Sequence, residues 1–116
     1  MATTIYGIKN CDTMKKARTW LEENGAGYDF HDYKASGIDL AHLEDWVGKA
    51  GWETVLNRAG TTFRKLPDAD RENLTRDKAI ALMLEQPSMI KRPVLEHDGK
   101  LLVGFKPDLY AAEFGK

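Results

Sequence analysis

The sequence predicts an α/β protein with a four-stranded mixed β-sheet. At the N-terminus a strand pattern, a helical pattern and a second strand pattern follow one another, as in a right-handed crossover between parallel strands. Near the C-terminus, Asp98-Gly99 separates two apolar runs, as in a β-hairpin. The region between them has helical spacing. Residues 1–116 are therefore expected to form a single domain with a helical insertion between its N-terminal βαβ unit and its C-terminal ββα unit.

The N-terminal elements are predicted from local residue preferences. Thr3–Tyr6 are β-branched or aromatic and precede Gly7, which predicts a strand that leads into a loop. The segment 10–13, with an Asn, a Cys, an Asp and a Thr, is typical of a helix start. Apolar residues then recur at helical spacing until Gly25, which ends the helix. Alternating residues at 28–33 predict the second strand.

The middle of the chain, about residues 36–86, is predicted to be helical. Apolar residues repeat at helical spacing from Leu40 to Val47, and residues 52–57 form another short helical pattern. A turn is expected at residues 60–62. Thr75 is expected to cap a further helix that Pro87 ends.

The C-terminal part predicts a hairpin followed by a helix. Residues 93–97 and 100–103 read as its two strands, and we expect His97, beside the turn, to be exposed. Pro107 opens the last helix. Residues of about 1–35 and 87–116 would thus build the sheet, and the whole plan is that of a thioredoxin-like fold.

Charge and composition exclude several classes of function. Seventeen Lys and Arg residues face eighteen Asp and Glu residues, so we expect neither nucleic acid nor a membrane surface as a partner. The N-terminal residues lack the pattern of a secretory signal, and the longest apolar run, residues 79–84, is too short to span a membrane. The three histidines have no metal-ligand spacing, so no metal site is expected. We predict a cytoplasmic monomer.

The single cysteine, Cys11, lies at the predicted start of the first helix. A thiolate there meets unpaired backbone N–H groups and the positive end of the helix dipole, which both lower the thiol pKa. The helix alone leaves most of the thiol protonated at neutral pH, so cations must contribute as well. Lys9, two residues before Cys11, is one candidate cation. Lys15 and Lys16, one helical turn after it, are others unless their side chains point to water. Thr13 could donate a hydrogen bond to the thiolate.

The residues around Cys11 limit its chemistry. The usual redox motif at such a helix start is C-x-x-C, but Met14 occupies the second position and is expected in the core. A mixed disulfide at Cys11 must therefore be resolved by a thiol from another molecule, for which glutathione is the natural candidate. The alternative is that Cys11 is a small buried apolar residue without chemistry.

Two segments resemble a known family. Residues 6–13, Tyr-Gly-Ile-Lys-Asn-Cys-Asp-Thr, and the triplet Arg92-Pro93-Val94 resemble the ArsC/Spx family of arsenate-reductase-like proteins. The string Gly-Ile-Lys-Asn-Cys-Asp-Thr resembles its YffB branch in particular. The resemblance spans nearly the whole chain, because the helical insertion, the Arg-Pro strand start and the segment Phe105-Lys106-Pro107 follow in the family's order.

The resemblance implies a thioredoxin-like fold and a set of site residues. Cys11 matches the family's nucleophile, and Arg92 matches the anion-binding arginine before a proline that is expected to be cis, here Pro93. Arg58 is a candidate for the arginine supplied by the insertion. Where arsenate reductases carry a third arginine, this chain has Lys106, which offers a point charge and no bidentate fork.

Three hypotheses for function follow. The first is a glutathione-dependent thiol reductase in which Cys11 attacks an oxidised sulfur or an oxyanion. Arg92, Lys106 and Arg58 hold the anion, with Lys9, Asn10, Thr13 and Pro93 as supporting residues and without a tightly bound cofactor. Arsenate reduction is a narrower version that Lys106 disfavours. The second is a regulator that binds RNA polymerase, as Spx-like members do, although their redox switch is a C-x-x-C pair. The third is a non-catalytic domain.

Overall fold

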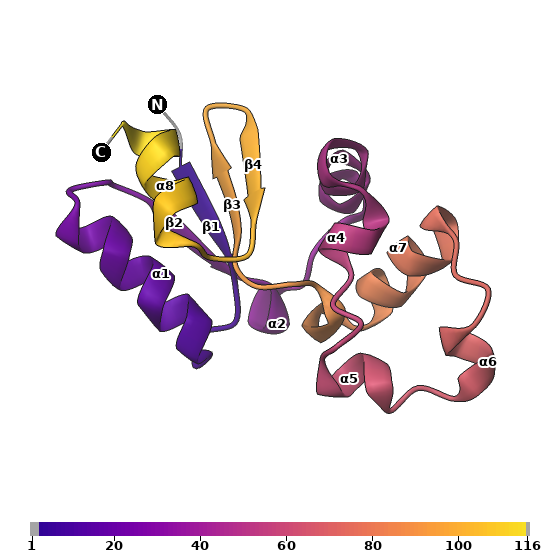
Figure 1. Cartoon of the computed structure of the whole chain (residues 1–116). Coiled ribbons are helices and arrows are strands. Elements are labelled where there is room, and N and C mark those ends of the chain that lie inside the picture. Colours follow the sequence, from indigo (N-terminus) through magenta and orange to yellow (C-terminus); the bar gives the residue numbers. More distant parts are fainter. Residues whose placement is uncertain (1–2, 116) are drawn as a thin grey trace.

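The computed structural model describes residues 3–115, and Figure 1 shows how their helices and strands are arranged. In chain order the elements are β1 (Thr3–Gly7), α1 (Asp12–Glu23), β2 (Asp29–Asp32), α2 (Tyr33–Ser36), α3 (Leu40–Ala50), α4 (Trp52–Val55), α5 (Thr61–Arg64), α6 (Asp68–Arg71), α7 (Arg76–Glu85), the 3₁₀-helix η1 (Pro87–Met89), β3 (Val94–His97), β4 (Lys100–Val103) and α8 (Pro107–Phe114). The molecule is elongated, 45 × 26 × 25 Å, with the sheet toward one end and α3 to α7 toward the other (Figure 1).

The four strands form one mixed sheet in the order β2-β1-β3-β4. β1 is parallel to β2, with Ile5 opposite Phe30, and antiparallel to β3, with Ile5 opposite Leu95. β3 and β4 form the hairpin, whose turn residues Asp98 and Gly99 both have positive φ. The predicted α/β class, the four-stranded mixed sheet and its thioredoxin-like plan are confirmed.

The sheet separates two apolar cores, because successive side chains of a strand point to opposite faces. The core under α1 and α8 contains Ile5, Met14, Ala17, Leu21, Leu95 and Tyr110. The core on the other face joins Tyr6 and Val94 to buried residues of the helical segment, among them Leu43, Trp46, Ala79 and Met83. Met14 therefore lies in the core, as its spacing predicted.

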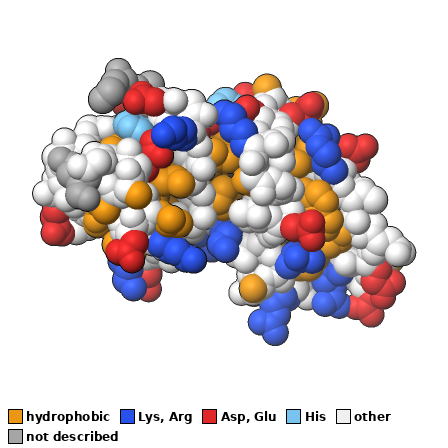
Figure 2. All heavy atoms as spheres, turned by 45° about the horizontal axis from the view of Figure 1, so that its top comes forward, with side chains coloured by type: hydrophobic (Ala, Val, Ile, Leu, Met, Phe, Trp, Pro, Cys, Tyr) orange, Lys and Arg blue, Asp and Glu red, His pale blue; other side chains and the backbone are white. Residues whose placement is uncertain are grey.

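The surface carries both signs of charge. On the face shown in Figure 2, Lys and Arg side chains alternate with Asp and Glu side chains over both ends of the molecule, and apolar side chains gather between them. This distribution agrees with a net charge near zero. Among residues 3–115, no helix is long and apolar enough to cross a lipid bilayer.

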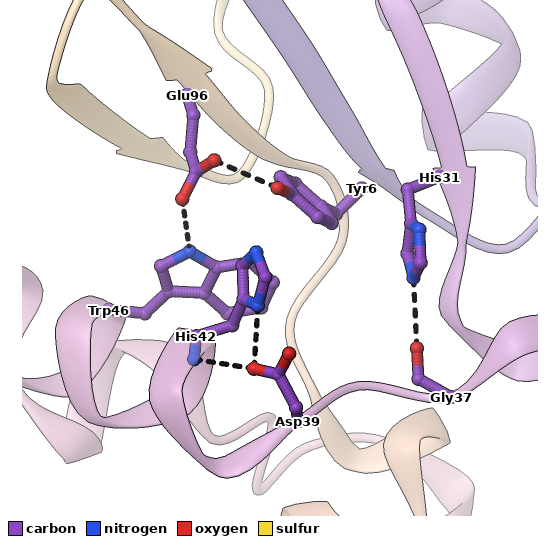
Figure 3. A network of polar contacts seen from close by, with 7 residues as sticks. All are labelled: Tyr6, His31, Gly37, Asp39, His42, Trp46 and Glu96. Carbon is purple, nitrogen blue, oxygen red and sulfur yellow. Dashed lines mark hydrogen bonds and ion pairs between the residues drawn. The ribbon is translucent and has the colours of Figure 1, made fainter.

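A polar network fixes the helical segment to the sheet (Figure 3). The Glu96 carboxylate of β3 accepts hydrogen bonds from the Tyr6 hydroxyl of β1 and from Trp46 Nε1 of α3, each 2.8 Å long. Burial raises the pKa of Tyr6, and its hydrogen bond to Glu96 raises it further, so the phenol stays a donor. At the start of α3, Asp39 caps the helix through the backbone N–H of His42 and also contacts the His42 ring.

Two local predictions were wrong near β2 and β3. The second strand ends at Asp32, one residue before the predicted end, because the Asp32 side chain accepts hydrogen bonds from two backbone N–H groups of α2 and starts that helix at Tyr33. His97, predicted to be exposed, is only 9 % exposed. Its Nδ1 lies 2.7 Å from the hydroxyl of Thr3 on the neighbouring strand, and its ring packs on Phe114.

In the helical segment the predicted turn at 60–62 is instead the start of the short helix α5, and α6 was not predicted. Both helices are four residues long, which is too short for an apolar period to show in the sequence. Thr75 caps α7 through the backbone N–H of Lys78, as predicted.

Gly7 ends β1 directly beside the loop that carries Cys11, and it is buried. A Cβ atom at this position would lie 2.1 Å from Met14 Sδ and 2.6 Å from Met14 Cε. The first turn of α1 can therefore approach the sheet closely only because residue 7 has no side chain. The sequence predicts only that Gly7 leads from the strand into a loop, so this close contact is a finding of the structure.

We predict that Gly7→Ala lowers the free energy of unfolding by about 2–3 kcal/mol, because the added methyl group must displace a fully buried methionine. Urea denaturation measures the change. Gly48→Ala is the matched control, since Gly48 lies within α3 and a Cβ there meets no atom within 4 Å. That control should be neutral or stabilising by up to about 1 kcal/mol. Equal effects of the two variants would contradict the close contact.

Candidate active site

Cys11 is the N-cap residue of α1. Its backbone is extended, with φ −92° and ψ 134°, and its carbonyl accepts the first helical hydrogen bond from Lys15 N at 3.0 Å. The thiol is partly exposed at the end of the sheet. The Cys11 side chain accepts no capping hydrogen bond from the first turn of α1. The backbone N–H groups of Met14 and Thr13 are nevertheless placed to stabilise a thiolate.

The surroundings of Cys11 favour the ionised thiol. Burial raises the pKa of the Cys11 thiol, but this effect is outweighed. The backbone N–H groups of Met14 and Thr13 lower the pKa, and the Arg92 guanidinium lowers it further through a hydrogen bond and its charge. The net result is a pKa below that of an ordinary cysteine, as a nucleophilic thiolate requires.

Arg92 reaches Cys11 from the segment that precedes β3. It is half-buried, and its Nη1 donates to the Ser88 carbonyl at 3.3 Å, which anchors the guanidinium. The peptide bond between Arg92 and Pro93 is cis, as the family resemblance implied. Arg92 and Cys11 are far apart in the sequence, so the antiparallel pairing of β1 and β3 brings them together.

Tyr33 lies near this pair and is fully buried. Its hydroxyl donates a 2.9 Å hydrogen bond to the Ile90 carbonyl, two residues before Arg92. Burial raises the pKa of Tyr33, and the Cys11 thiolate raises it as well, whereas Arg92 lowers it. Tyr33 is thus a neutral phenol near the thiol and the guanidinium, and its hydrogen bond to Ile90 holds the backbone from which Arg92 extends.

With this geometry, the comparison with known proteins is decisive. The sequence model of the ArsC family matches residues 6–113.

The chain belongs to the ArsC family.

Two solved structures show how close this ArsC-family protein is to others. It is 68 % identical to a protein named YffB, with a TM-score of 0.93 over 96 % of this chain and 97 % of that one. It is 62 % identical to an arsenate reductase (ArsC) related protein from Brucella melitensis, with a TM-score of 0.79 over 98 % of this chain and 95 % of that one.

Curated relatives include both an uncharacterised protein and a regulator. A protein from Haemophilus influenzae is 40 % identical over 96 % of this chain and 97 % of its own length. The global transcriptional regulator Spx of Listeria innocua is 25 % identical over 90 % of this chain and 81 % of its own length. The family therefore contains both reductase-related proteins and a regulator.

The two other predicted anion-binding residues, Lys106 and Arg58, lie on segments whose backbones are hydrogen-bonded to the segment that carries Arg92. Lys106 is exposed at the N-cap of α8, and its turn is held by a 2.8 Å hydrogen bond from Gly104 N to the Pro93 carbonyl. Arg58 is exposed between α4 and α5, with its guanidinium carbon 5.7 Å from the centre of the Trp52 ring. Among residues 3–115, Arg92 is the cation that lowers the pKa of the Cys11 thiol.

The supporting residues have different places. Lys9 and Asn10 form the exposed turn before Cys11. Thr13 acts on the thiol through its backbone N–H and not, as predicted, through its hydroxyl. Within residues 3–115 there is also no group of three or more His, Cys, Asp or Glu side chains that could hold a metal ion.

We predict that Tyr33→Phe destabilises the ArsC-family protein by about 1–2 kcal/mol, because the Ile90 carbonyl loses its buried donor. The same change should loosen Arg92 and lower thiolate reactivity severalfold at neutral pH. Thermal unfolding and the rate of Cys11 alkylation measure the two effects. Tyr28→Phe, at a partly exposed hydroxyl, is the control and should change neither by much. If Tyr33→Phe leaves the alkylation rate unchanged, Tyr33 has no positioning role.

Proposed function

We propose that this ArsC-family protein is a glutathione-dependent thiol reductase with Cys11 as its nucleophile. The observation that carries the proposal is a partly exposed thiol at a helix N-terminus, where two backbone N–H groups and the anchored Arg92 guanidinium lower the pKa of the thiol. A low pKa and accessibility together are what distinguish reactive from structural cysteines. The relatedness to an arsenate reductase related protein supports the same class of reaction.

The proposed reaction proceeds in two exchange steps. The Cys11 thiolate attacks a sulfur of a disulfide that contains glutathione, so a bond from Cys11 to the glutathione sulfur forms and the disulfide bond breaks. The other thiol leaves as a thiolate and takes a proton from water. A glutathione thiolate then attacks the mixed disulfide, which restores the Cys11 thiolate and releases glutathione disulfide. Glutathione is the reductant, because this chain has one cysteine and cannot supply a resolving thiol.

The basic residues give the proposed site its preference for anions. Arg92 can hold a carboxylate of glutathione while it stabilises the thiolate. Lys106 and Arg58 lie on segments whose backbones are hydrogen-bonded to residues 89–93, the stretch that leads into β3. We propose that both side chains complete the anion site when the substrate is bound. Arsenate is a less favoured substrate, because Lys106 offers a point charge instead of a planar fork.

A regulatory role is the second candidate, and the relatedness to Spx favours it. A regulator that is switched by a C-x-x-C pair needs a second cysteine at the fourth position of the motif, which is residue 14 in this chain. Met14 stands there and is fully buried. The chain would therefore have to bind RNA polymerase without that switch. A pull-down with polymerase subunits tests this candidate directly.

The reductase is tested by turnover of the mixed disulfide of glutathione and 2-mercaptoethanol, with excess glutathione as reductant. We expect glutathione disulfide to form at a rate proportional to protein concentration. Arsenate, offered in parallel with glutathione, should be turned over far more slowly. The proposal is wrong if the protein accelerates neither reaction over glutathione alone, or if the Cys11 thiol alkylates no faster than a free cysteine at neutral pH.

A further inference from the structure

A groove runs along α1 from the turn that follows Cys11. It has a volume of about 410 Å³ and is closed on its other side by the turn that leads into α8. Its lining residues are Lys15, Lys16, Thr19, Trp20, Glu23, Phe105 and Pro107.

The groove begins one helical turn from the candidate active site. Lys15 lies one helical turn after Cys11, with its backbone N–H bonded to the Cys11 carbonyl. Cys11, Trp20 and Phe105 all pack against the same apolar core between the sheet and α1. A molecule bonded to the sulfur therefore has to extend along about one helical turn, roughly 5 Å, to reach the groove.

The groove is apolar in the middle and charged at its ends. Trp20 and Phe105 are partly exposed there, and both rings are fixed by edge contacts with Tyr110, at centroid distances of 5.6 and 4.8 Å. Lys15 and Lys16 stand at the end nearer to Cys11, at the positive end of the helix dipole. Glu23 stands at the far end. The surface thus has a direction, basic near the thiol and acidic away from it.

The dimensions suit a short stretch of polypeptide. From Lys15 to Glu23 the helix rises by about 12 Å, at roughly 1.5 Å per residue. An extended chain covers that length with about four residues, at roughly 3.3 Å each. Arg92, the proposed glutathione ligand, is not among the groove residues. The two halves of a mixed disulfide can therefore occupy different places.

We propose that the groove binds the polypeptide half of the substrate, and that the substrate is a mixed disulfide between glutathione and a protein thiol. This inference rests on the reductase function proposed above. The bound segment carries an acidic residue close to its cysteine, facing Lys15 and Lys16, and an apolar side chain after it, over Trp20 and Phe105. Attack by the Cys11 thiolate on the glutathione sulfur expels the protein thiolate, which takes up a proton from water. The second glutathione regenerates Cys11 as before.

The test compares three mixed disulfides of glutathione on the full chain. One carries a peptide with Glu and Leu after the cysteine, one carries the same peptide with Lys in place of Glu, and the third carries 2-mercaptoethanol. We expect kcat/KM to be about tenfold higher for the acidic peptide than for the basic one at low salt, and the difference to shrink at high salt.

Charge reversal supplies the decisive variant. Lys15→Glu combined with Lys16→Glu should reverse the preference between the two peptides. Each peptide rate is divided by the same variant's rate on the 2-mercaptoethanol disulfide, which removes any change in the reactivity of the thiol itself. Lys49→Glu combined with Lys65→Glu is the matched control on the helical segment, and it should preserve the preference.

The outcomes separate the two proposals. Equal turnover of both peptides by the native chain, or a preference that the Lys15 and Lys16 variant retains, would overturn the groove proposal while leaving the reductase intact. Absence of turnover for all three disulfides would instead refute the reductase itself. To detect binding without chemistry, the acidic peptide with Ser in place of Cys should shift the amide resonances of α1 and Phe105. Shifts elsewhere alone would also contradict the groove.

Discussion

Replacing Cys11 by serine should reduce glutathione-dependent turnover by at least about a thousandfold, because a hydroxyl is not ionised at neutral pH and cannot form a disulfide. The same substitution should not damage the fold. Cys11 is an N-cap residue without a regular side-chain cap, and serine is a preferred N-cap residue. We therefore expect the free energy of unfolding to stay constant or rise by up to about 1 kcal/mol while activity is lost.

A loss of turnover without a loss of folding stability identifies Cys11 as a nucleophile and not as a structural residue. Turnover of the 2-mercaptoethanol disulfide and urea denaturation measure the two quantities on the same preparation. Cys11→Ala is the second variant. It should lose activity equally but gain no stability, because it has no capping oxygen. If either variant retained more than a tenth of the native turnover, the reaction would not pass through a bond to this sulfur.

The sequence alone could predict the sheet and the place of Cys11, because both depend on short-range patterns. The β-branched and aromatic residues of β1, the Asp98-Gly99 turn and the helical period after Asp12 each require only neighbouring residues. A cysteine between a strand end and a helix start is at a helix N-terminus whatever the rest of the chain does. Met14 followed the same local logic and does lie in the core.

Features that depend on contacts between distant segments could not be predicted in this way. Tyr33 continued the alternation of β2, so the start of α2 at Tyr33, capped by Asp32, and the bond of Tyr33 to the Ile90 carbonyl could not be predicted. His97 is buried because Thr3, at the other end of the chain, lies opposite it in the sheet. The basic residues near the site could not be ranked, because only the pairing of β1 with β3 brings Arg92 to Cys11.

Gly7 is the sequence signal that points to close packing at the site. Gly7 directly precedes the loop that carries Cys11, and a glycine at the end of a strand often marks a close approach of another segment. Here the approaching group is the Met14 side chain from the first turn of α1. The contact that Gly7 permits also sets the distance between the N-terminus of α1 and the end of the sheet where Arg92 precedes β3.

Replacing Arg92 by methionine should lower kcat/KM at neutral pH by about a hundredfold, because the thiolate loses its hydrogen-bonding cation and glutathione loses its carboxylate ligand. The pKa of the Cys11 thiol should rise, so the midpoint of its alkylation rate against pH should move upward. Arg92→Lys should restore part of the pKa decrease but little of the turnover, since lysine keeps the charge without the fork. Arg64→Met, at an exposed arginine of α5, is the control and should change neither quantity.

The pH dependence separates the two roles of Arg92. The folded-state pKa of Cys11 is depressed, so ionisation of the thiol stabilises the native chain above the unfolded-state pKa, and this contribution is lost as the pH falls through the folded-state pKa. In Arg92→Met that contribution should shrink. Well above the pKa of both proteins the thiol is fully ionised, so their alkylation rates should converge, whereas turnover should remain low because glutathione binding is not restored. If turnover recovered together with alkylation at high pH, Arg92 would act on the thiol alone and not on the anion.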